Sequence, residues 1–272
     1  MEAEDLRVLI VQPDLAWEDI DYNLNHIEKL IEGADNGFNV ILLPEMFSTG
    51  FTGNATALAE PVNGKTMQRV KRWASRFSSL VMGSFIAVDG ERYYNRGFAV
   101  EPDGTTRFYD KRHLFFGTEK KLFTAGESKL IFNYKGWNIS LVVCYDLRFP
   151  VWIRNRQLEY DVLFCVAEWP VSRQNVLETL TMARAIENQC YTFMCNRVGS
   201  DSNFLKYIGG SQAVDFNGKL IDRLDDGKEE ARIITIQKYP LLSNREKAPV
   251  WQDAEAFELL SLGVLEFRSS GV

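Results

Sequence analysis

The sequence contains little histidine and no cysteine pattern typical of a metal or disulfide framework. Only two histidines occur among 272 residues, at positions 26 and 113, and this scarcity excludes most zinc sites built on imidazole. The four cysteines form no CxxC pair, which disfavours a thiol redox protein with a nearby resolving cysteine. A chain of this length without secretory features is not expected to depend on disulfides. We therefore expect no metal site.

Long hydrophobic runs and an excess of positive charge are also absent. No apolar run approaches the roughly 20 residues of a membrane-spanning helix, and the acidic start MEAED does not resemble a secretory signal. The net charge of −6 disfavours a nucleic-acid-binding surface. Hydrophobic and charged fractions of 46% and 25% are typical of globular proteins. We expect a cytoplasmic protein that binds neither membranes nor nucleic acids.

The hydrophobic pattern predicts a mixed α/β fold. Apolar runs at 7–11, 40–43 and 80–88 indicate buried strands, and apolar residues spaced by three and four at 20–34 and 67–77 indicate helices. Turn sequences at 101–104, 135–136 and 217–218 then separate pairs of antiparallel strands. Hairpins inside a strand–helix alternation fit two packed sheets with outer helices better than a doubly wound sheet.

The later elements and the domain limits follow from the same pattern. Strands are expected at 161–167 and 191–196, with a helix at 176–189 and another that opens at Pro150 and runs to residue 158. We expect a single domain over residues 1–260. Residues 261–272 lack periodicity and are expected to be a disordered tail or a cloning remnant.

Cys144 is the cysteine placed best for chemistry. It ends the apolar run at 139–143 and precedes the sequence YDLRFP. A strand that turns sharply into a helix exposes its last residue and directs the following N–H groups toward it, as a nucleophile with an oxyanion hole requires. A buried structural cysteine is the alternative, and the same alternative applies to Cys165, Cys190 and Cys195.

Three charged residues occupy similar positions after predicted strands or turns. Glu45 follows the strand at 40–43 and is a candidate general base for a thiol. Lys111 follows the strand at 105–109 and is a candidate for stabilising an oxyanion. Glu119 lies eight residues after Lys111 in a polar turn. Taken singly, each is more typical of a solvated loop residue than of a catalytic one.

Taken together, these residues and their surroundings resemble the nitrilase superfamily of carbon–nitrogen hydrolases. The matching strings are LPEMF at 43–47, YDKRHLF at 109–115 and VCYDLRFP at 143–150. The resemblance extends over residues 6–251. More narrowly, EMFSTGF at 45–51 and CYDLRFP at 144–150 are similar to the omega-amidase branch, whose members act on 2-oxoglutaramate.

The resemblance implies a fold and a set of catalytic roles. The expected fold is a four-layer α-β-β-α sandwich, and two such sandwiches are expected to form a homodimer. Cys144 corresponds to the nucleophile, Glu45 to the general base and Lys111 to the oxyanion-stabilising lysine. Glu119 corresponds to the second glutamate, which positions substrate and steers protons, and the backbone N–H of Tyr145 corresponds to part of the oxyanion hole. The chemistry implied needs no metal or organic cofactor.

Residues around this centre are expected to contact substrate. The resemblance places Trp169 at the border of the pocket, with Phe47 and Phe116 as further aromatic candidates. Arg148 is a candidate for binding a substrate carboxylate, and an internal ion pair is its alternative. We expect His113 to be a hydrogen-bonded loop residue, because Glu45 already supplies a base.

The function implied by the resemblance is hydrolysis of dicarboxylate monoamides such as 2-oxoglutaramate. An aliphatic amidase, a nitrilase and a carbamoyl-amine hydrolase remain open alternatives within the superfamily. A non-catalytic scaffold with the same fold is another, although a binding protein has no need of Cys144, Glu45 and Lys111 together. The expected partner is a small amide.

Overall fold

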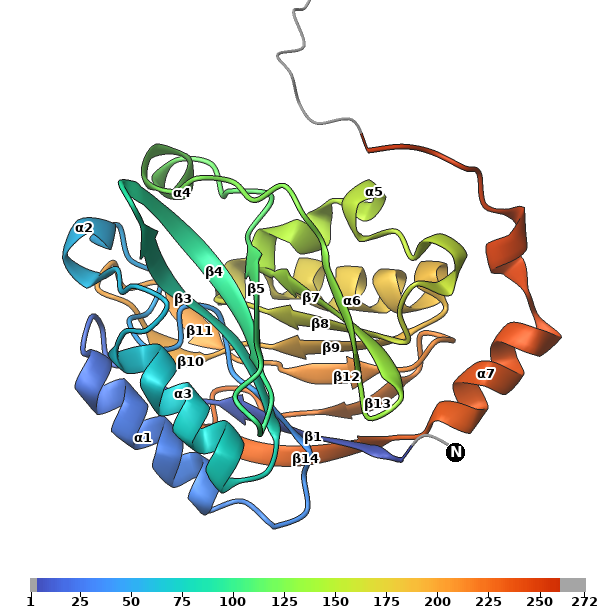
Figure 1. Cartoon of the computed structure of the whole chain (residues 1–272), viewed down its shortest axis with the longest axis horizontal. Helices are drawn as coiled ribbons and strands as arrows, with labels where there is room; N and C mark the ends of the chain where they lie inside the picture. The colour runs from blue at the N-terminus through green and yellow to red at the C-terminus, as the bar shows by residue number, and fades with distance from the viewer. Residues whose placement is uncertain (1–3, 260–272) are drawn as a thin grey trace, which may run out of the picture.

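The computed structural model describes residues 4–259, so the expected tail at 261–272 lies outside the described residues. Two six-stranded sheets pack face to face (Figure 1), and each contains both parallel and antiparallel pairs. In spatial order, the strands of the first sheet are β14 (Glu230–Ile236), β1 (Leu6–Gln12), β2 (Val40–Leu42), β3 (Leu80–Asp89), β4 (Arg92–Val100) and β5 (Thr106–Asp110). Those of the second are β13 (Leu220–Arg223), β12 (Gln212–Val214), β9 (Tyr191–Cys195), β8 (Val162–Val166), β7 (Trp137–Val143) and β6 (Leu130–Tyr134).

Helices and a small ladder complete the described chain. The small ladder consists of β10 (Val198–Ser200) and β11 (Lys206–Ile208). The α-helices are α1 (Ile20–Glu32), α2 (Ala55–Leu58), α3 (Lys65–Arg76), α4 (Thr118–Leu122), α5 (Pro150–Ile153), α6 (Gln174–Asn188) and α7 (Lys238–Lys247). Single turns of 3₁₀-helix are η1 (Cys144–Arg148), η2 (Arg156–Leu158), η3 (Val171–Arg173) and η4 (Val250–Asp253).

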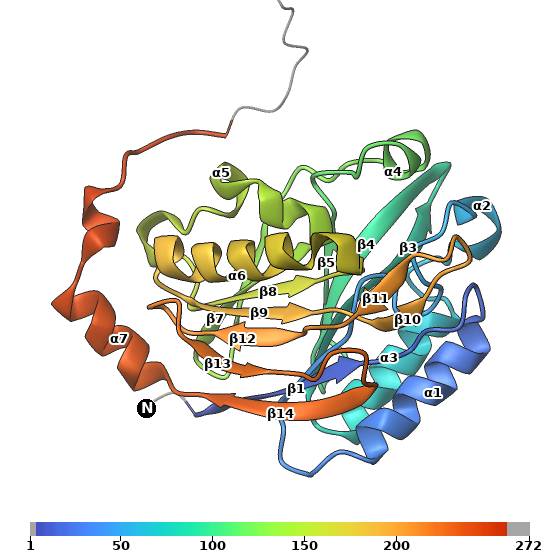
Figure 2. The same cartoon turned by 180° about the vertical axis from the view of Figure 1, so that it is seen from behind.

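The alternation of side chains along the central strands produces the layers. In β1, Val8 and Ile10 belong to the core shared by the two sheets, whereas Leu9 and Val11 face α1 and α3. The other side of the second sheet is covered by α6 (Figure 2), which packs against β9 and β12 and buries Leu177 on that outer face. The order helix, sheet, sheet, helix confirms the predicted mixed α/β fold with four layers.

The helix predicted at 150–158 is wrong beyond its first turn. Only α5 is α-helical, and Gln157 in the following η2 has a positive φ of 51°. The side chain of Asn155 explains the break, because its Nδ2 donates to the carbonyl of Tyr160 at 2.8 Å and its Oδ1 accepts from the N–H of Tyr160 at 3.0 Å. These bonds satisfy backbone groups that a continued helix would have paired.

The described helices are short. The longest described helix, α6, has 15 residues, and no helix between residues 4 and 259 is long and apolar enough to cross a membrane. Over the same residues, no three His, Cys, Asp or Glu side chains are grouped to hold a metal ion.

Candidate active site

Four reactive side chains follow the ends of strands in the two sheets. Glu45 lies three residues after β2, Lys111 directly after β5, Cys144 directly after β7 and Glu168 two residues after β8. The side chains of Glu45 and Glu168 are fully buried, and that of Lys111 is 1% exposed. The packing of the two sheets thus brings charged groups from both sheets into one region that water hardly reaches.

A lysine shared by two carboxylates forms the centre of this region. Lys111 Nζ donates to Glu45 Oε1 at 2.8 Å and to Glu119 Oε2 at 2.7 Å. Asn95 Nδ2 bridges the same carboxylates, at 2.7 Å from Glu45 Oε1 and 2.9 Å from Glu119 Oε1. Because an ammonium has three N–H donors, one N–H of Lys111 remains free to contact a substrate oxygen.

The surroundings fix the charge of Lys111. Burial alone would lower the pKa of Lys111, but the carboxylates of Glu119 and Glu45 outweigh it and hold this pKa well above its usual value. Burial raises the pKa of Glu119, and the attraction of Lys111 opposes that rise. Lys111 therefore stays an ammonium near neutral pH.

The thiol of Cys144 is uncharged at rest. Burial raises the pKa of Cys144 well above its usual value, and the negative charge of Glu45 raises it further, against the opposing charge of Lys111. Because the thiolate rather than the thiol is nucleophilic, attack on a substrate needs a base that removes the proton. Glu45 is close enough to influence the Cys144 thiol and is placed to be that base.

The backbone turns sharply at Cys144. This residue has a positive φ of 46° at the start of η1, a conformation that costs a non-glycine residue about 1–3 kcal/mol. The buried carboxylate of Asp146 holds the turn by accepting bonds from Val143 N at 3.1 Å, His113 N at 2.8 Å and Tyr109 Oη at 2.7 Å. Asp146 therefore ties the turn at Cys144 to the segment that follows β5.

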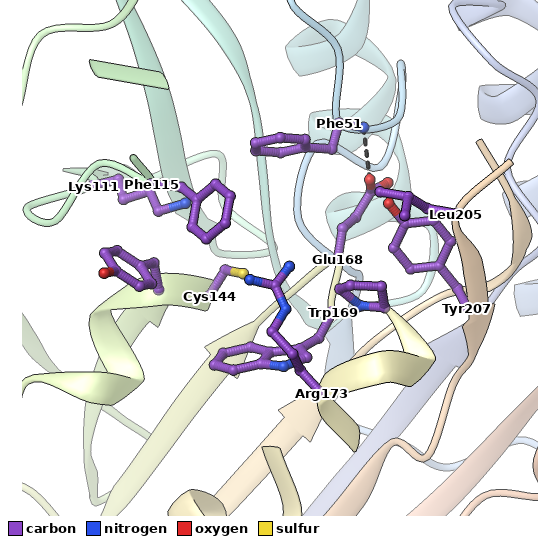
Figure 3. Close-up of a pocket in the computed structure, with 11 residues that line it drawn as sticks. Phe51, Lys111, Phe115, Cys144, Glu168, Trp169, Arg173, Leu205 and Tyr207 are labelled. Carbon is purple, nitrogen blue, oxygen red and sulfur yellow. Dashed lines mark hydrogen bonds between the residues drawn. The ribbon is translucent and has the colours of Figure 1, made fainter. Parts of the chain in front are cut away.

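A cavity of about 70 Å³ contacts this cluster (Figure 3). At about 10–15 Å³ per water site, this volume accommodates roughly five waters, which suits a small molecule. Figure 3 shows Lys111 on one side of Cys144 and Glu168 on the other. The lining residues are Phe51, Lys111, Phe115, Cys144, Tyr145, Glu168, Trp169, Pro170, Arg173, Leu205 and Tyr207.

The structure brings most of the sequence-predicted site residues together. Cys144, Lys111, Tyr145 and Trp169 line the cavity, and Glu45 and Glu119 lie directly behind Lys111. The backbone N–H of Tyr145 belongs to the first turn of η1, where N–H groups have no intrahelical partner.

Two aromatic residues occupy other places than expected. Phe47 is fully buried in the core between the first sheet and α3, with its ring 6.2 Å from that of Trp73 and 5.8 Å from that of Phe98. It does not line the cavity, so the expected substrate contact of Phe47 is corrected to a packing role. Phe116 is 62% exposed and also lies outside the lining, because its neighbour Phe115 turns inward instead.

Arg148 and His113 also lie outside the cavity lining. The guanidinium of Arg148 packs over the ring of Trp169 at 5.2 Å, and among residues 4–259 it forms no ion pair, so the alternative prediction for Arg148 is wrong. His113 Nδ1 lies 2.8 Å from Asp146 Oδ1, and its ring stacks on Phe149 at 3.7 Å. This is the hydrogen-bonded loop position expected for His113.

Sequence reasoning missed Asn95, Glu168 and Arg173 as site residues. Glu168 had the same signal as Glu45, since each is a carboxylate just after a short buried strand. Asn95 lies in the middle of β4 and Arg173 ends η3. Neither position stands out in the sequence. Only folding brings Arg173 to the cavity and Asn95 to Glu45 and Glu119.

The chain is similar to known proteins over most of its length. Residues 7–239 match the family model described as carbon-nitrogen hydrolase. The chain is 40% identical over 259 residues to the omega-amidase YafV of Escherichia coli strain K12, which covers 93% of this chain and 98% of the relative. It is 31% identical over 249 residues to the 2-oxoglutaramate amidase of Bacillus subtilis strain 168, and the match covers 89% of this chain and 95% of the relative.

A solved structure is similar over the same length. The crystal structure of a CN-hydrolase superfamily protein from Xanthomonas campestris, which carries an arsenic adduct in its active site, has a TM-score of 0.92 and 37% sequence identity. It covers 94% of this chain, and 99% of its own chain is matched. With a family match over most of its length and relatives matched almost end to end, the chain belongs to the carbon–nitrogen hydrolase family of the nitrilase superfamily.

Proposed function

We propose that this chain is an omega-amidase, which hydrolyses the terminal amide of dicarboxylate monoamides such as 2-oxoglutaramate to the acid and ammonia. The observation that carries the proposal is the contact of Cys144 with the buried pair of Lys111 and Glu45, at the base of a small cavity that also contains Arg173. The names of the relatives from Escherichia coli and Bacillus subtilis support the substrate class.

In the first half of the reaction, Glu45 takes the proton of the Cys144 thiol and the thiolate attacks the amide carbon. The free N–H of Lys111 and the backbone N–H of Tyr145 hold the developing oxyanion. One such preorganised donor contributes ~3–4 kcal/mol to transition-state stabilisation. Glu45 then gives its proton to the amide nitrogen, the C–N bond breaks, and ammonia leaves a thioester on Cys144.

In the second half, Glu45 acts as a base toward water. The water attacks the thioester carbon, the C–S bond breaks, and Cys144 recovers its proton as the acid product leaves. Glu119 does not touch the reacting atoms in this scheme, but it holds Lys111 in position through the bond of 2.7 Å. Splitting amide hydrolysis into two steps lowers the barrier of each.

The proposed substrate carries a carboxylate at the end away from its amide, and Arg173 is placed to bind it. Arg173 lines the cavity and packs over the rings of Phe115 at 4.9 Å and Trp169 at 6.0 Å. Within residues 4–259 no carboxylate forms an ion pair with it. A cation left without a partner in the absence of substrate favours amides that bring a carboxylate over plain aliphatic amides.

The assembly and location of the enzyme belong to the same proposal. We propose a homodimer, supported by apolar side chains that are exposed on α5 and α6: Val151 at 57%, Met182 at 43% and Ile186 at 48%. We also propose a cytoplasmic location, because all four cysteines are free thiols, as is usual in a reducing compartment. A single catalytic domain over residues 1–260 completes the proposal.

Ammonia release from a panel of amides tests the function. The panel contains 2-oxoglutaramate, succinamate, glutamine, butyramide, butyronitrile and a carbamoyl amino acid. We expect kcat/KM for 2-oxoglutaramate to exceed that for butyramide by about 100-fold or more, because butyramide has no carboxylate and leaves Arg173 unpaired. Equal rates on butyramide would indicate an aliphatic amidase, and faster nitrile hydrolysis a nitrilase. A folded protein that releases ammonia from none of them would be a non-catalytic scaffold.

A further inference from the structure

Glu168 is a buried carboxyl group that the proposed mechanism does not use. Its side chain is fully buried and lines the cavity. Oε2 accepts the N–H of Phe51 at 2.6 Å (Figure 3), whereas Oε1 has no hydrogen-bond partner among the described residues. A buried polar atom without a hydrogen bond is costly, and the contact of Oε1 with Arg197 Nη1 at 3.8 Å is too long to be one. A carboxyl oxygen in this state beside a cavity is therefore available to a ligand.

The neighbours of Glu168 disfavour its charged form. The backbone N–H of Glu168 donates to Glu45 Oε2 at 2.9 Å, and the negative charge of Glu45 opposes ionisation of the Glu168 carboxyl. The nearest cation is Arg197, whose Nη1 is 3.8 Å from Glu168 Oε1 and forms no hydrogen bond. The other guanidinium nitrogens of Arg197 donate to the carbonyls of Val198 and Leu15.

Burial, together with the repulsion of Glu45 and Asp201, raises the pKa of Glu168 to about 8 against the attraction of Arg197. The remaining charged or titratable groups in the lining are Lys111, Cys144, Tyr145, Arg173 and Tyr207. Tyr207 Oη is bonded to Asp201 Oδ2 at 3.2 Å. Near neutral pH the protonated form of Glu168 therefore predominates, and a neutral carboxyl in a dry site carries an O–H that can donate a hydrogen bond.

We propose that Glu168 is a specificity-determining residue that donates a hydrogen bond to the 2-oxo oxygen of the substrate. This inference rests on the proposed omega-amidase function and names the part of the substrate that Glu168 reads. Cys144 and Lys111 hold the amide end, and Glu168 lies on the other side of Cys144 (Figure 3). In 2-oxoglutaramate the oxo group and the carboxylate lie at the end away from the amide, where Glu168 and Arg173 are available.

The inference distinguishes an oxo group from an ammonium group at the same substrate position. A charged glutamate would favour the ammonium of glutamine, whereas a neutral carboxyl favours the oxo oxygen. Glutaramate, which has the same carbon chain without the oxo group, is the matched substrate for comparison. The ratio of kcat/KM for 2-oxoglutaramate to that for glutaramate then isolates the contact with the oxo oxygen.

Three variants test the contact. Glu168→Leu removes the donor, and we expect the ratio to fall about 10-fold, the size of one neutral hydrogen bond. Because the ratio compares two substrates on the same variant, a loss common to both cancels. Glu168→Gln keeps a donor of the same shape, so it should retain most of the ratio.

The pH dependence of the ratio is a second test. The wild-type ratio should decline from pH 7 to 9 as Glu168 ionises, and that of Glu168→Gln should stay flat. Glu246→Gln, an exposed position on α7, should behave as wild type.

Each contrary result is distinct. An unchanged ratio in Glu168→Leu, with the fold verified by circular dichroism, overturns the contact. A wild-type preference for glutamine that disappears in Glu168→Gln overturns it in favour of an ammonium site. If the wild type hydrolyses neither amide, the proposed function fails. Calorimetry with 2-oxoglutarate and glutarate then tests Glu168 alone: equal effects of Glu168→Leu on both affinities overturn the inference, and a selective loss for 2-oxoglutarate supports it.

Discussion

At the scale of single residues, Glu45 and His113 are the two side chains near Cys144 with the chemistry of a base. Glu45 adjoins the thiol, whereas His113 is bonded to Asp146 and lies outside the cavity lining. We expect Glu45→Gln to lower kcat by about 100- to 10,000-fold and His113→Asn to lower it by less than about 10-fold. Steady-state ammonia release measures both. The reverse ranking would indicate a cysteine–histidine hydrolase instead.

The ionisation of Glu168 also affects stability. With a pKa of about 8 in the folded protein against 4.5 ordinarily, Glu168 keeps a proton that the unfolded chain releases. Its stabilising contribution is therefore complete below pH 4.5 and is lost as the pH rises through 8. At 1.36 kcal/mol per pKa unit, the loss is roughly 2–5 kcal/mol.

Urea unfolding of wild type and Glu168→Gln at pH 5 and pH 9 measures this loss. Glutamine does not titrate, so the free energy of unfolding of wild type should fall relative to the variant between these pH values. The other titrating groups are common to both proteins and cancel in the comparison. A difference that stays constant with pH would show that Glu168 ionises normally.

At the scale of elements, the contact between β5 and the segment after α4 places Lys111. The N–H of Gly126 donates to the carbonyl of Lys111 at 3.0 Å, and a Cβ at this glycine would lie 2.0 Å from the carbonyl oxygen of Asp110. Gly126→Ala must push the two segments apart, so we expect a loss of about 1–3 kcal/mol in stability and a fall of more than 10-fold in kcat. The two measurements are thermal unfolding and ammonia release.

Gly33→Ala is the control for this substitution. Gly33 caps α1 with a negative φ of −79°, and the nearest atom to an added Cβ is the carbonyl oxygen of Lys29 at 3.3 Å. We expect little change in kcat. Equal effects of both substitutions on kcat would mean that the position of Lys111 does not depend on the contact at Gly126.

Most elements could be predicted because their hydrophobic pattern is regular. The central strands are buried on both faces and read as continuous apolar runs, and α1 shows residues spaced by three and four, with Leu24, Ile27 and Ile31 buried. The segment at 150–158 has apolar residues as well, but Asn155 pairs with Tyr160 and ends the helix early. Asn155 is also held from α6, since its N–H donates to Asn188 Oδ1 and its Nδ2 to the carbonyl of Asn188. Periodicity does not record such side-chain hydrogen bonds.

The catalytic residues of the candidate site could be predicted from the sequence, but most of the cavity wall could not. Glu45, Lys111 and Cys144 stand in motifs of adjacent residues, so the sequence alone singled them out. Phe47 stands in one of those motifs and yet packs in the core, because the turn after β2 directs its ring toward α3. Arg173 reaches the cavity through the packing of η3 and belongs to no motif.

At the scale of the whole molecule, the exposed apolar residues of α5 and α6 predict self-association. Light scattering at micromolar concentration should give twice the chain mass of 31.2 kDa. Val151, at 57% exposure in α5, is expected in the interface, so Val151→Asp should shift the protein toward the monomer because a buried unpaired charge is costly. A wild type that runs at 31.2 kDa would refute the homodimer.

The central claim is that this molecule hydrolyses omega-amides through a thioester on Cys144. Ammonia release from 2-oxoglutaramate, measured side by side for wild type and Cys144→Ala with the fold of both verified, tests it most directly. The wild type should turn over, and Cys144→Ala should lose about 10,000-fold or more of kcat, since removing a nucleophile can cost on the order of a millionfold. Comparable turnover by Cys144→Ala would contradict the covalent mechanism, and a wild type inactive on this amide would contradict the omega-amidase function.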